Sequence, residues 1–198
     1  MAEQEKQPQK KPGWKKSLVL YLHDVTVYLI IICIVFLLLF RVVVVSGTSM
    51  NLTLLDGDYL LLLNKFFYGK PEYGDIIVAS KRSYDDGAPI VKRVIATEGQ
   101  TVDIDFLTGT VYVDGVALEE DYIWTDTTTT GGTRFPLTVD DGCVFVMGDN
   151  RGNSRDSRYT DIGLIDEREI LGKAVFLFIP GTNDGDFEPD FDRIGVIE

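Results

Sequence analysis

Hydrophobic positions form one long stretch near the N-terminus of the chain. Residues 25–40 are 16 successive residues without a charge, and the apolar stretch that begins at Leu18 extends the segment to about 23 residues. A helix of that length measures roughly 34 Å at about 1.5 Å per residue, which is enough to cross the hydrocarbon core of a bilayer. We therefore predict a membrane anchor over residues 17–45.

The flanks of this stretch predict its type and its orientation. Residues 1–16 contain five Lys and two Glu, and no Ala-x-Ala cleavage site follows the apolar stretch. The missing cleavage site favours an uncleaved anchor over a secretory signal peptide, while a buried helix of a soluble protein remains the alternative. By the positive-inside rule, residues 1–16 form a cytoplasmic basic tail and residues 46–198 lie on the outer face of the plasma membrane. We expect His23 and Asp24 near the cytoplasmic headgroups, where ionisable groups stay hydrated.

After residue 45 the pattern changes to short apolar runs rich in β-branched and aromatic residues, which favour strands. Turn signals that contain Gly and Asp separate these runs. We predict a mainly β fold class: one N-terminal transmembrane helix, then a mostly antiparallel β domain over residues 46–198, with one helical turn at residues 166–171. The polar segments 125–133 and 183–192 are expected to be surface loops, the first of them mobile. The predicted strands cover residues 59–63, 75–79, 90–96, 101–104, 110–113, 143–147 and 173–179.

Charge and cysteine content exclude several kinds of partner. The net charge is −12, and residues 42–198 hold 13 Lys and Arg against 28 Asp and Glu. A domain this acidic repels a phosphate backbone, so we expect no nucleic acid partner. Two Cys and one His, well separated in the sequence, are too few for a zinc site or a disulfide framework. We expect no metal, and we interpret Cys33 and Cys143 as small packing residues.

The single histidine limits the catalytic chemistry that the outer domain can perform. A Ser-His-Asp triad needs a histidine in that domain, but His23 precedes the membrane segment. A serine nucleophile would therefore need another base. A lysine made neutral by burial is the recognised alternative.

Two segments supply such a pair, and a third accompanies them. Ser49 follows the membrane exit in a bend that Gly47 permits, where backbone amides could converge on an oxyanion. Lys92 lies among apolar residues of a predicted strand, with Arg93 on the opposite face. Taken alone, these are an ordinary turn serine and an ordinary strand lysine. The third segment, residues 147–159, is dense in polar side chains, and on pattern alone it is a solvated loop stiffened by Asp–Arg pairs.

Together these segments resemble the ordered sequence boxes of bacterial type I signal peptidases, also called leader peptidases. The short interval between Lys92 and Gly148 is similar to the compact, Gram-positive-like members of that family. The matching residues are Ser49-Met50 with Thr53-Leu54, then Gly74-Asp75, then Lys92-Arg93-Val94-Ile95, then Gly148-Asp149-Asn150-Arg151 with Ser154, Asp156, Ser157 and Arg158.

The resemblance implies a membrane-anchored serine endopeptidase that removes signal peptides from exported preproteins after small residues of the A-x-A type, without a cofactor. It implies that Ser49 is the nucleophile, that Lys92 is the general base and that Ser154 orients the lysine amine. The backbone N–H of Ser49 would donate to the oxyanion, and Gly47 offers no side-chain donor. The residues of a structural ion-pair loop would be Arg93, Asp149, Asp156 and Arg158. The candidates for the lining of the small-residue pocket are Ile77 and Ile90.

One residue departs from the family pattern. The box of the family reads Ser-Met-x-Pro-Thr-Leu, whereas Leu52 stands in the proline position here. Proline fixes φ and stiffens a turn, so its loss is expected to loosen the turn behind the nucleophile and to lower activity severalfold. The remaining alternative of another class is a catalytically silent, membrane-anchored β domain that binds partners or preproteins.

Overall fold

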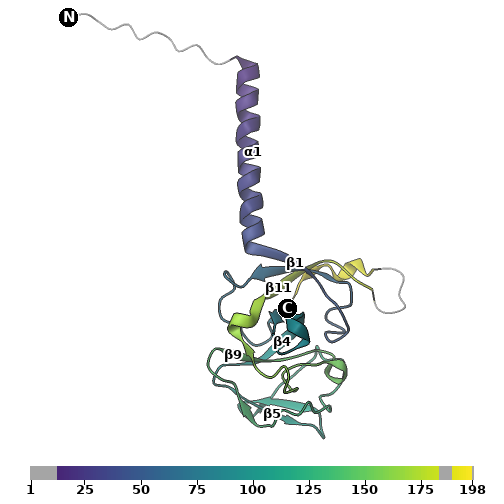
Figure 1. Ribbon diagram of the computed structural model, residues 1–198. Helices are drawn as coiled ribbons and strands as arrows, with labels where there is room; N and C mark the ends of the chain where they lie inside the picture. The colour runs from purple at the N-terminus through teal and green to yellow at the C-terminus, as the bar shows by residue number, and fades with distance from the viewer. Residues whose placement is uncertain (1–12, 183–188, 198) are drawn as a thin grey trace, which may run out of the picture. The chain divides into compact units, whose positions relative to one another are not determined.

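The computed structural model describes residues 13–182 and 189–197, and the chain divides into two units, residues 1–38 and residues 39–198. The first unit contains helix α1 (Trp14–Leu39), an apolar helix none of whose residues is buried (Figure 1). Its 26 residues make it long enough and apolar enough to cross a membrane, and it is the one such helix among the described residues. Most of the expected basic tail, residues 1–12, lies outside the described residues.

The helix ends earlier than the anchor boundary expected from the sequence. It stops at Leu39, and β1 (Phe40–Val44) follows directly and pairs antiparallel with β2 (Tyr59–Asn64). The four successive valines from Val42 explain the change, because β-branched side chains fit a pleated sheet better than a helix. Residues 40–44 therefore belong to the β unit.

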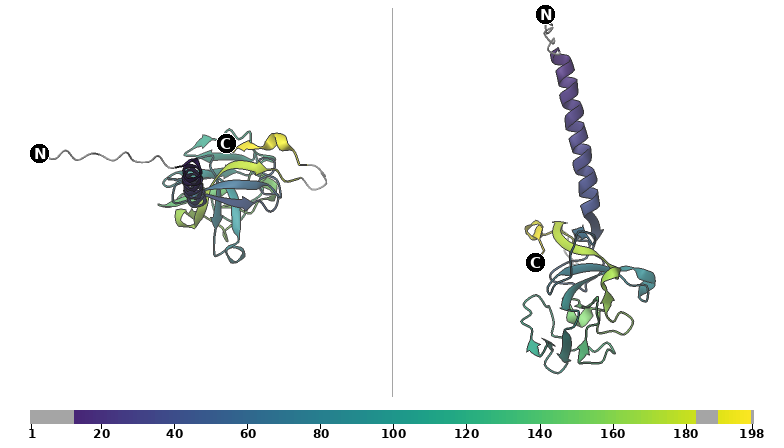
Figure 2. Two further views of the ribbon diagram at one scale, coloured as in Figure 1. Left: turned by 90° about the horizontal axis from the view of Figure 1, so that it is seen from above. Right: turned by 90° about the vertical axis from the view of Figure 1, so that its left-hand side faces the viewer.

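Two antiparallel sheets make up the β unit. The first has the strand order β1-β2-β11-β3-β4-β9-β10, with β12 paired to β11, and the second has the order β7-β6-β5-β8. Figures 1 and 2 show the second sheet, marked by β5, at the opposite end of this unit from β1. The further strands of the first sheet are β3 (Ile76–Ser80), β4 (Pro89–Thr97), β9 (Cys143–Met147), β10 (Ile165–Asp166), β11 (Ile170–Ile179) and β12 (Gly195–Val196). Those of the second are β5 (Thr101–Asp105), β6 (Thr110–Val113), β7 (Val116–Ala117) and β8 (Leu137–Thr138).

The predicted fold class is confirmed, since every predicted strand is present within a few residues. The described part of the chain contains four short 3₁₀ turns between strands: η1 (Asp85–Gly87), η2 (Arg151–Asn153), η3 (Glu167–Glu169) and η4 (Phe191–Arg193). The helical turn expected at residues 166–171 is η3, where Asp166 and Glu169 form a capping box. Of the acidic segment 183–192, residues 183–188 lie outside the described residues.

Among the described residues, three clusters of buried apolar side chains form the core, and one of them includes neighbours of Ser49 in the sequence. One cluster fills the space between the sheets, where Ile95 and Phe145 of the first sheet meet Val102 and Val111 of the second. Cys143 packs against this cluster, whereas Cys33 is exposed on α1. Another cluster contains Val45, Met50 and Leu54, which flank Ser49 in the sequence, so the loop that carries Ser49 is tied into the core.

Candidate active site

Ser49 lies on a loop, residues 45–58, that hydrogen bonds close at its base. The Val45 amide donates to the Asp58 carbonyl at 2.9 Å, and the Gly57 amide donates to the Val45 carbonyl at 3.0 Å. The fully buried Asp58 carboxylate accepts from the Leu55 amide at 2.7 Å and pairs with Arg193 of η4 at 2.6 Å. The two ends of this nucleophile loop are therefore fixed to each other and to the C-terminal segment.

Within this loop, the residues next to Ser49 differ in backbone conformation and burial. Gly47 has a φ of +90°, a conformation that favours glycine, and its amide donates to Asp56 at 2.7 Å. Met50 and Leu54 are buried and hold the segment after the nucleophile. The Ser49 amide donates a hydrogen bond to none of the residues that the structure describes. That amide can therefore serve as an oxyanion donor, and no side chain at position 47 adds a second one.

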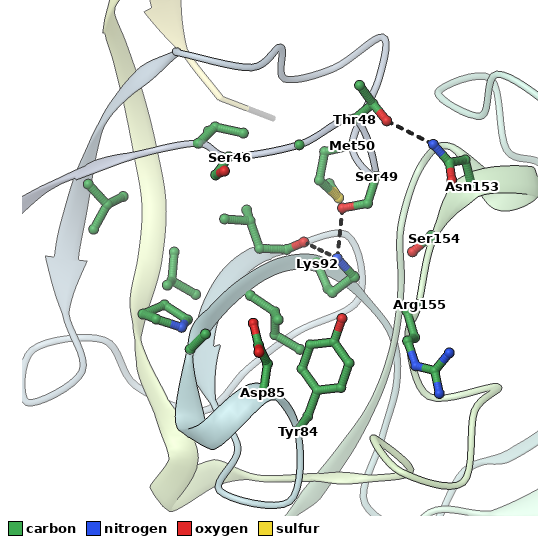
Figure 3. A pocket seen from close by; sticks show the side chains of 18 of the residues that line it. Ser46, Thr48, Ser49, Met50, Tyr84, Asp85, Lys92, Asn153, Ser154 and Arg155 are labelled. Carbon is green, nitrogen blue, oxygen red and sulfur yellow. Dashed lines mark hydrogen bonds between the residues drawn. The ribbon is translucent and has the colours of Figure 1, made fainter.

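Lys92 reaches Ser49 from strand β4. Its Nζ donates to Ser49 Oγ at 2.8 Å and to the Val91 carbonyl at 2.8 Å, and Figure 3 shows the two side chains pointing toward one another. Lys92 is only 5% exposed, since β4 is buried on both faces from this residue onward. The arrangement places a nucleophilic oxygen and a nitrogen base in direct contact, as an activated serine requires.

Burial determines the protonation of Lys92. Removing the ammonium group from water disfavours the charged form, and this desolvation lowers the pKa of Lys92 to about 8. The carboxylates of Asp156 and Asp149 raise this pKa and Arg158 lowers it, but burial has the largest effect. Much of the amine is therefore neutral at mildly alkaline pH, where an ordinary lysine with a pKa of about 10.4 is almost fully charged.

Ser154 is near this pair but does not make the contact expected from the sequence. It lines the same pocket as Ser49 and Lys92, and its buried Oγ has no hydrogen-bond partner among the described residues. The Lys92 amine is directed to Ser49 and to the Val91 carbonyl instead. The hydrogen bond from Ser154 to Lys92 is therefore absent in this arrangement, and an orienting role for Ser154 stays a prediction.

The four residues expected in one ion-pair cluster form two separate buried pairs. Arg93 donates to both carboxylate oxygens of Asp149 at 2.9 Å, and Thr53 Oγ1 donates to the same carboxylate at 2.5 Å. Arg158 donates to both oxygens of Asp156, at 2.8 and 2.9 Å. Asp149 thus joins the residue after Lys92 to a residue just beyond Ser49, which fixes the spacing of Lys92 and Ser49.

The pocket above Ser49 and Lys92 has a volume of about 880 Å³ and lies between two extended segments, residues 43–46 and 89–91. Ile90 lines it as expected, but Ile77 does not: it pairs with Lys92 across the sheet and is fully buried in the core. No three side chains that could together hold a metal ion gather within residues 13–182 and 189–197.

Residues 18–179 match the family model described as signal peptidase, peptidase S26. The chain belongs to this family. It is 38% identical over 170 residues to a probable signal peptidase I-1 of Synechocystis sp., covering 79% of this chain and 83% of that protein. It is 32% identical over 180 residues to signal peptidase I of Bacillus licheniformis, covering 87% and 94%. A solved signal peptidase I of Enterococcus faecalis V583 is 32% identical, with a TM-score of 0.45 over 54% of this chain and 97% of that one.

This signal peptidase, a serine endopeptidase, also contains contacts that the sequence analysis missed. The Asn150 amide donates to the Ser49 carbonyl at 3.0 Å, and its side chain donates to the Thr48 carbonyl at 3.0 Å. Asn153 Nδ2 donates to Thr48 Oγ1 at 2.9 Å. A Cβ on Gly148 would lie 2.4 Å from the Ser49 carbonyl oxygen, so only glycine fits there. The polar loop after β9 therefore clamps the nucleophile loop, a set of contacts that neither its dense polar pattern nor its family box predicted.

Two residues of this signal peptidase that the sequence did not reveal, Glu120 and Tyr122, contact Arg151 of the same loop and Arg93 of β4. The buried guanidinium of Arg151 donates to both carboxylate oxygens of Glu120 and forms a buried ion pair with it. The ring of Tyr122 lies 4.1 Å from the Arg93 guanidinium, a cation–π contact. Glu120 and Tyr122 lie in the connection between β7 and β8, whose sequence has no periodic pattern that predicts these contacts.

The prediction of a surface loop for residues 125–133 is wrong for part of that segment. Thr127 is fully buried, and its hydroxyl accepts a hydrogen bond from Arg151 at 2.8 Å. Thr125 Oγ1 accepts from the Gly152 amide at 2.9 Å. The hydroxyls of Thr125 and Thr127 therefore accept hydrogen bonds from Gly152 and Arg151 in the polar loop after β9. Contacts between segments so distant in the sequence cannot be predicted from local composition.

Proposed function

We propose that this chain is a membrane-anchored signal peptidase that cleaves preproteins with Ser49 and Lys92 as a catalytic dyad. The observation that carries the proposal is the 2.8 Å contact between Lys92 Nζ and Ser49 Oγ, with the lysine buried. Family membership supports signal-peptide cleavage by a serine protease. Our proposal adds three points to family membership: the Ser49–Lys92 dyad, the membrane anchor and the A-x-A type of cleavage site.

The geometry supports a two-step acyl transfer. Neutral Lys92 takes the hydroxyl proton as Ser49 Oγ attacks the scissile carbonyl carbon, and the oxyanion that forms is stabilised by the Ser49 N–H. When the C–N bond breaks, the ammonium of Lys92 returns the proton to the departing amine, leaving an ester on Ser49. Lys92 then deprotonates a water molecule, which attacks the ester, releases the signal peptide as a carboxylic acid and restores Ser49.

The walls of the pocket support an extended substrate. β1 is the edge strand of its sheet, and residues 89–91 of β4 pair only with β3, because the pairing of β4 with β9 begins at Arg93. An extended peptide laid between residues 43–46 and 89–91 can pair with the backbone groups that these edges leave unpaired among the described residues, as in β-strand addition. The Val45 backbone and the Val91 carbonyl already have partners. Small side chains before the scissile bond, of the A-x-A type, suit a pocket whose walls include Val78 and Ile90.

The length and composition of α1 support the membrane anchor, and the basic residues before it support a cytoplasmic N-terminus with residues 46–198 on the outer face of the plasma membrane. A signal peptide is itself apolar and lies in the membrane before cleavage. An enzyme tethered by one helix therefore meets its substrate in the same bilayer.

Cleavage of a synthetic preprotein by the full chain in detergent tests the dyad. Ser49→Ala and Lys92→Met are each expected to lower kcat by about a thousandfold or more, because each removes a reacting group. The matched controls are Ser83→Ala and Lys70→Met, which alter exposed residues outside the pocket and are expected to leave cleavage unchanged. Undiminished cleavage by Ser49→Ala would refute the dyad. An inert parent chain would favour the catalytically silent, membrane-anchored β domain that binds preproteins.

A further inference from the structure

A second cavity adjoins the catalytic pocket on the far side of the Thr48–Asn153 hydrogen bond. It has a volume of about 370 Å³, within the range of pockets that bind small ligands or side chains. We call it the Leu52 pocket. The residues that line it include Thr48, Asn51, Leu52, Trp124, Asn150 and Asn153.

The Leu52 pocket is continuous with the site of bond cleavage. Thr48 and Asn153 line both cavities, and the hydrogen bond between their side chains, drawn in Figure 3, marks the boundary. Ser49 directly follows Thr48 in the chain. A peptide whose acyl part occupies the catalytic pocket must continue beyond Ser49 after the scissile bond, and the Leu52 pocket is a concave surface that adjoins the catalytic pocket at Thr48 and Asn153.

The lining of the Leu52 pocket combines exposed apolar surface with an unsatisfied acceptor. Leu52 is 60% exposed and Trp124 is 52% exposed, so both present apolar surface to a bound chain. Asn51 is only 7% exposed, and its Oδ1 has no hydrogen-bond partner among the described residues. That oxygen is enclosed in this arrangement, so the pocket offers a bound chain mainly the exposed apolar surface of Leu52 and Trp124.

The residue that departs from the family box is therefore part of this wall. A proline at position 52 would present a short ring fixed to the backbone, whereas Leu52 presents a longer branched side chain. Leu52 and Trp124 come from distant parts of the sequence and line the same cavity. The departure at Leu52 thus alters a binding surface as well as the stiffness of a turn.

We propose that the Leu52 pocket binds the first residues of the mature protein, the segment released when the ester forms on Ser49, and that it favours an apolar side chain there. The inference rests on the proposed function, because it assigns a specificity-determining surface to the same cleavage reaction. In the proposed function, the peptide before the scissile bond lies between residues 43–46 and 89–91, which line the catalytic pocket. The leaving segment is thus the part of the substrate that remains to be placed.

Three synthetic preproteins test this proposal. They share one signal sequence and differ only in the first two residues after the cleavage site, which are Leu-Leu, Ala-Ala or Asp-Asp. The full chain in detergent is compared with Leu52→Ala, Trp124→Ala and the control Leu107→Ala, which removes a leucine that is 96% exposed outside both cavities.

The unaltered chain is expected to cleave the Leu-Leu preprotein with a kcat/KM about three to ten times that of the Asp-Asp preprotein, mainly through a lower KM. Leu52→Ala and Trp124→Ala are each expected to remove most of this preference, and Leu107→Ala is expected to keep it. An activated ester with the same signal sequence but no leaving peptide reports on the acyl side alone. Hydrolysis of that ester should change less in both variants than cleavage of the Leu-Leu preprotein.

The possible failures are distinguishable. Cleavage of all three preproteins at one rate, or a preference that survives both variants, would overturn the assignment of the Leu52 pocket and leave the dyad intact. If Leu52→Ala lost the same fraction of activity on the ester and on every preprotein, Leu52 would act only through the stiffness of the turn. That outcome would also overturn the assignment of the Leu52 pocket. If the unaltered chain cleaves no preprotein and no ester, the proposed function fails as well.

Discussion

At the scale of single residues, Lys92 shows how position determines chemistry. An exposed lysine is a strongly hydrated cation, whereas this one is enclosed by strand β4 and the nucleophile loop and contacts Ser49. Burial favours its neutral form, and two nearby carboxylates limit the fall of its pKa. The same amine would be a poor base at neutral pH on any exposed strand.

The protonation of Lys92 predicts how activity depends on pH. Only the neutral amine can accept the Ser49 proton, so kcat/KM is expected to rise about tenfold per pH unit below the pKa and to level off above about 8. The measurement is kcat/KM for one preprotein between pH 5 and pH 10. A rate that is constant from pH 5 to pH 7, where Lys92 is charged, would contradict a lysine base.

Ser154 offers a test that separates catalysis from folding. Its buried Oγ has no partner in the described part of the chain, so Ser154→Ala is expected to change the free energy of unfolding by less than about 1 kcal/mol. If the hydroxyl orients the Lys92 amine during the reaction, the same variant should lower kcat by about tenfold or more. Thermal unfolding and kinetics on one preparation provide both values. An unchanged kcat would remove Ser154 from the catalytic machinery.

At the scale of elements, the site depends on how the loop after β9 joins the nucleophile loop to β4. Asp149 is the link, since its carboxylate binds Arg93 of β4 and Thr53 of the segment after Ser49. Side-chain and backbone hydrogen bonds from Asn150 hold the other side of the nucleophile loop. The relative position of Lys92 and Ser49 is therefore set by groups outside the proposed dyad.

Removal of one partner from the Arg93–Asp149 pair should be costly. Asp149→Ala removes the carboxylate that accepts from both the buried Arg93 guanidinium and Thr53, which is expected to lower the free energy of unfolding by about 3–5 kcal/mol. Asp161→Ala is the matched control, because it breaks the largely exposed pair with Arg155, and its expected cost is below about 1 kcal/mol. Thermal unfolding of the full chain in detergent measures both variants. Equal effects would show that the buried pair has no special role.

The turn that contains Leu52 gives a second prediction at this scale. The Leu52 amide donates no hydrogen bond to the described residues, so a proline there would lose no backbone contact. Leu52→Pro is expected to raise kcat on the Ala-Ala preprotein by about two- to fivefold, because a stiffer loop holds Ser49 more firmly. Steady-state kinetics on that preprotein tests it. A variant that cleaves no faster would contradict the idea that the leucine loosens the loop.

The sequence predicted most of the long elements, because their patterns are local. β9 occupies the residues 143–147 that were predicted, and β4 extends the predicted run by one residue at each end. The strand β1 was missed because its valines continue the apolar stretch of the anchor. The dyad pair was found through motifs, whereas the contacts of Glu120 and Thr127 with Arg151 depend on residues brought together by folding. No local pattern contains that information.

At the scale of the whole molecule, the charge distribution predicts an orientation in the membrane. In the proposed orientation the Lys residues near the N-terminus lie on the cytoplasmic side, so a protease added outside spheroplasts is expected to digest residues 46–198 and to spare an epitope at the N-terminus. Immunoblots for epitopes at both ends measure this, with lysed cells as the control. Loss of the N-terminal epitope in intact spheroplasts would reverse the proposed orientation.

The pair between Arg193 and Asp58 has a practical consequence for anyone who prepares this protein. Arg193 is remote from Asp58 in the sequence, yet Asp58 closes the loop that carries Ser49. Cleavage by a contaminating protease on the N-terminal side of Arg193 would release this arginine and leave Asp58 buried without its counter-charge. The specific activity of such a preparation would fall although Ser49 and Lys92 stayed intact. Intact-mass spectrometry is therefore a useful quality check for this protein.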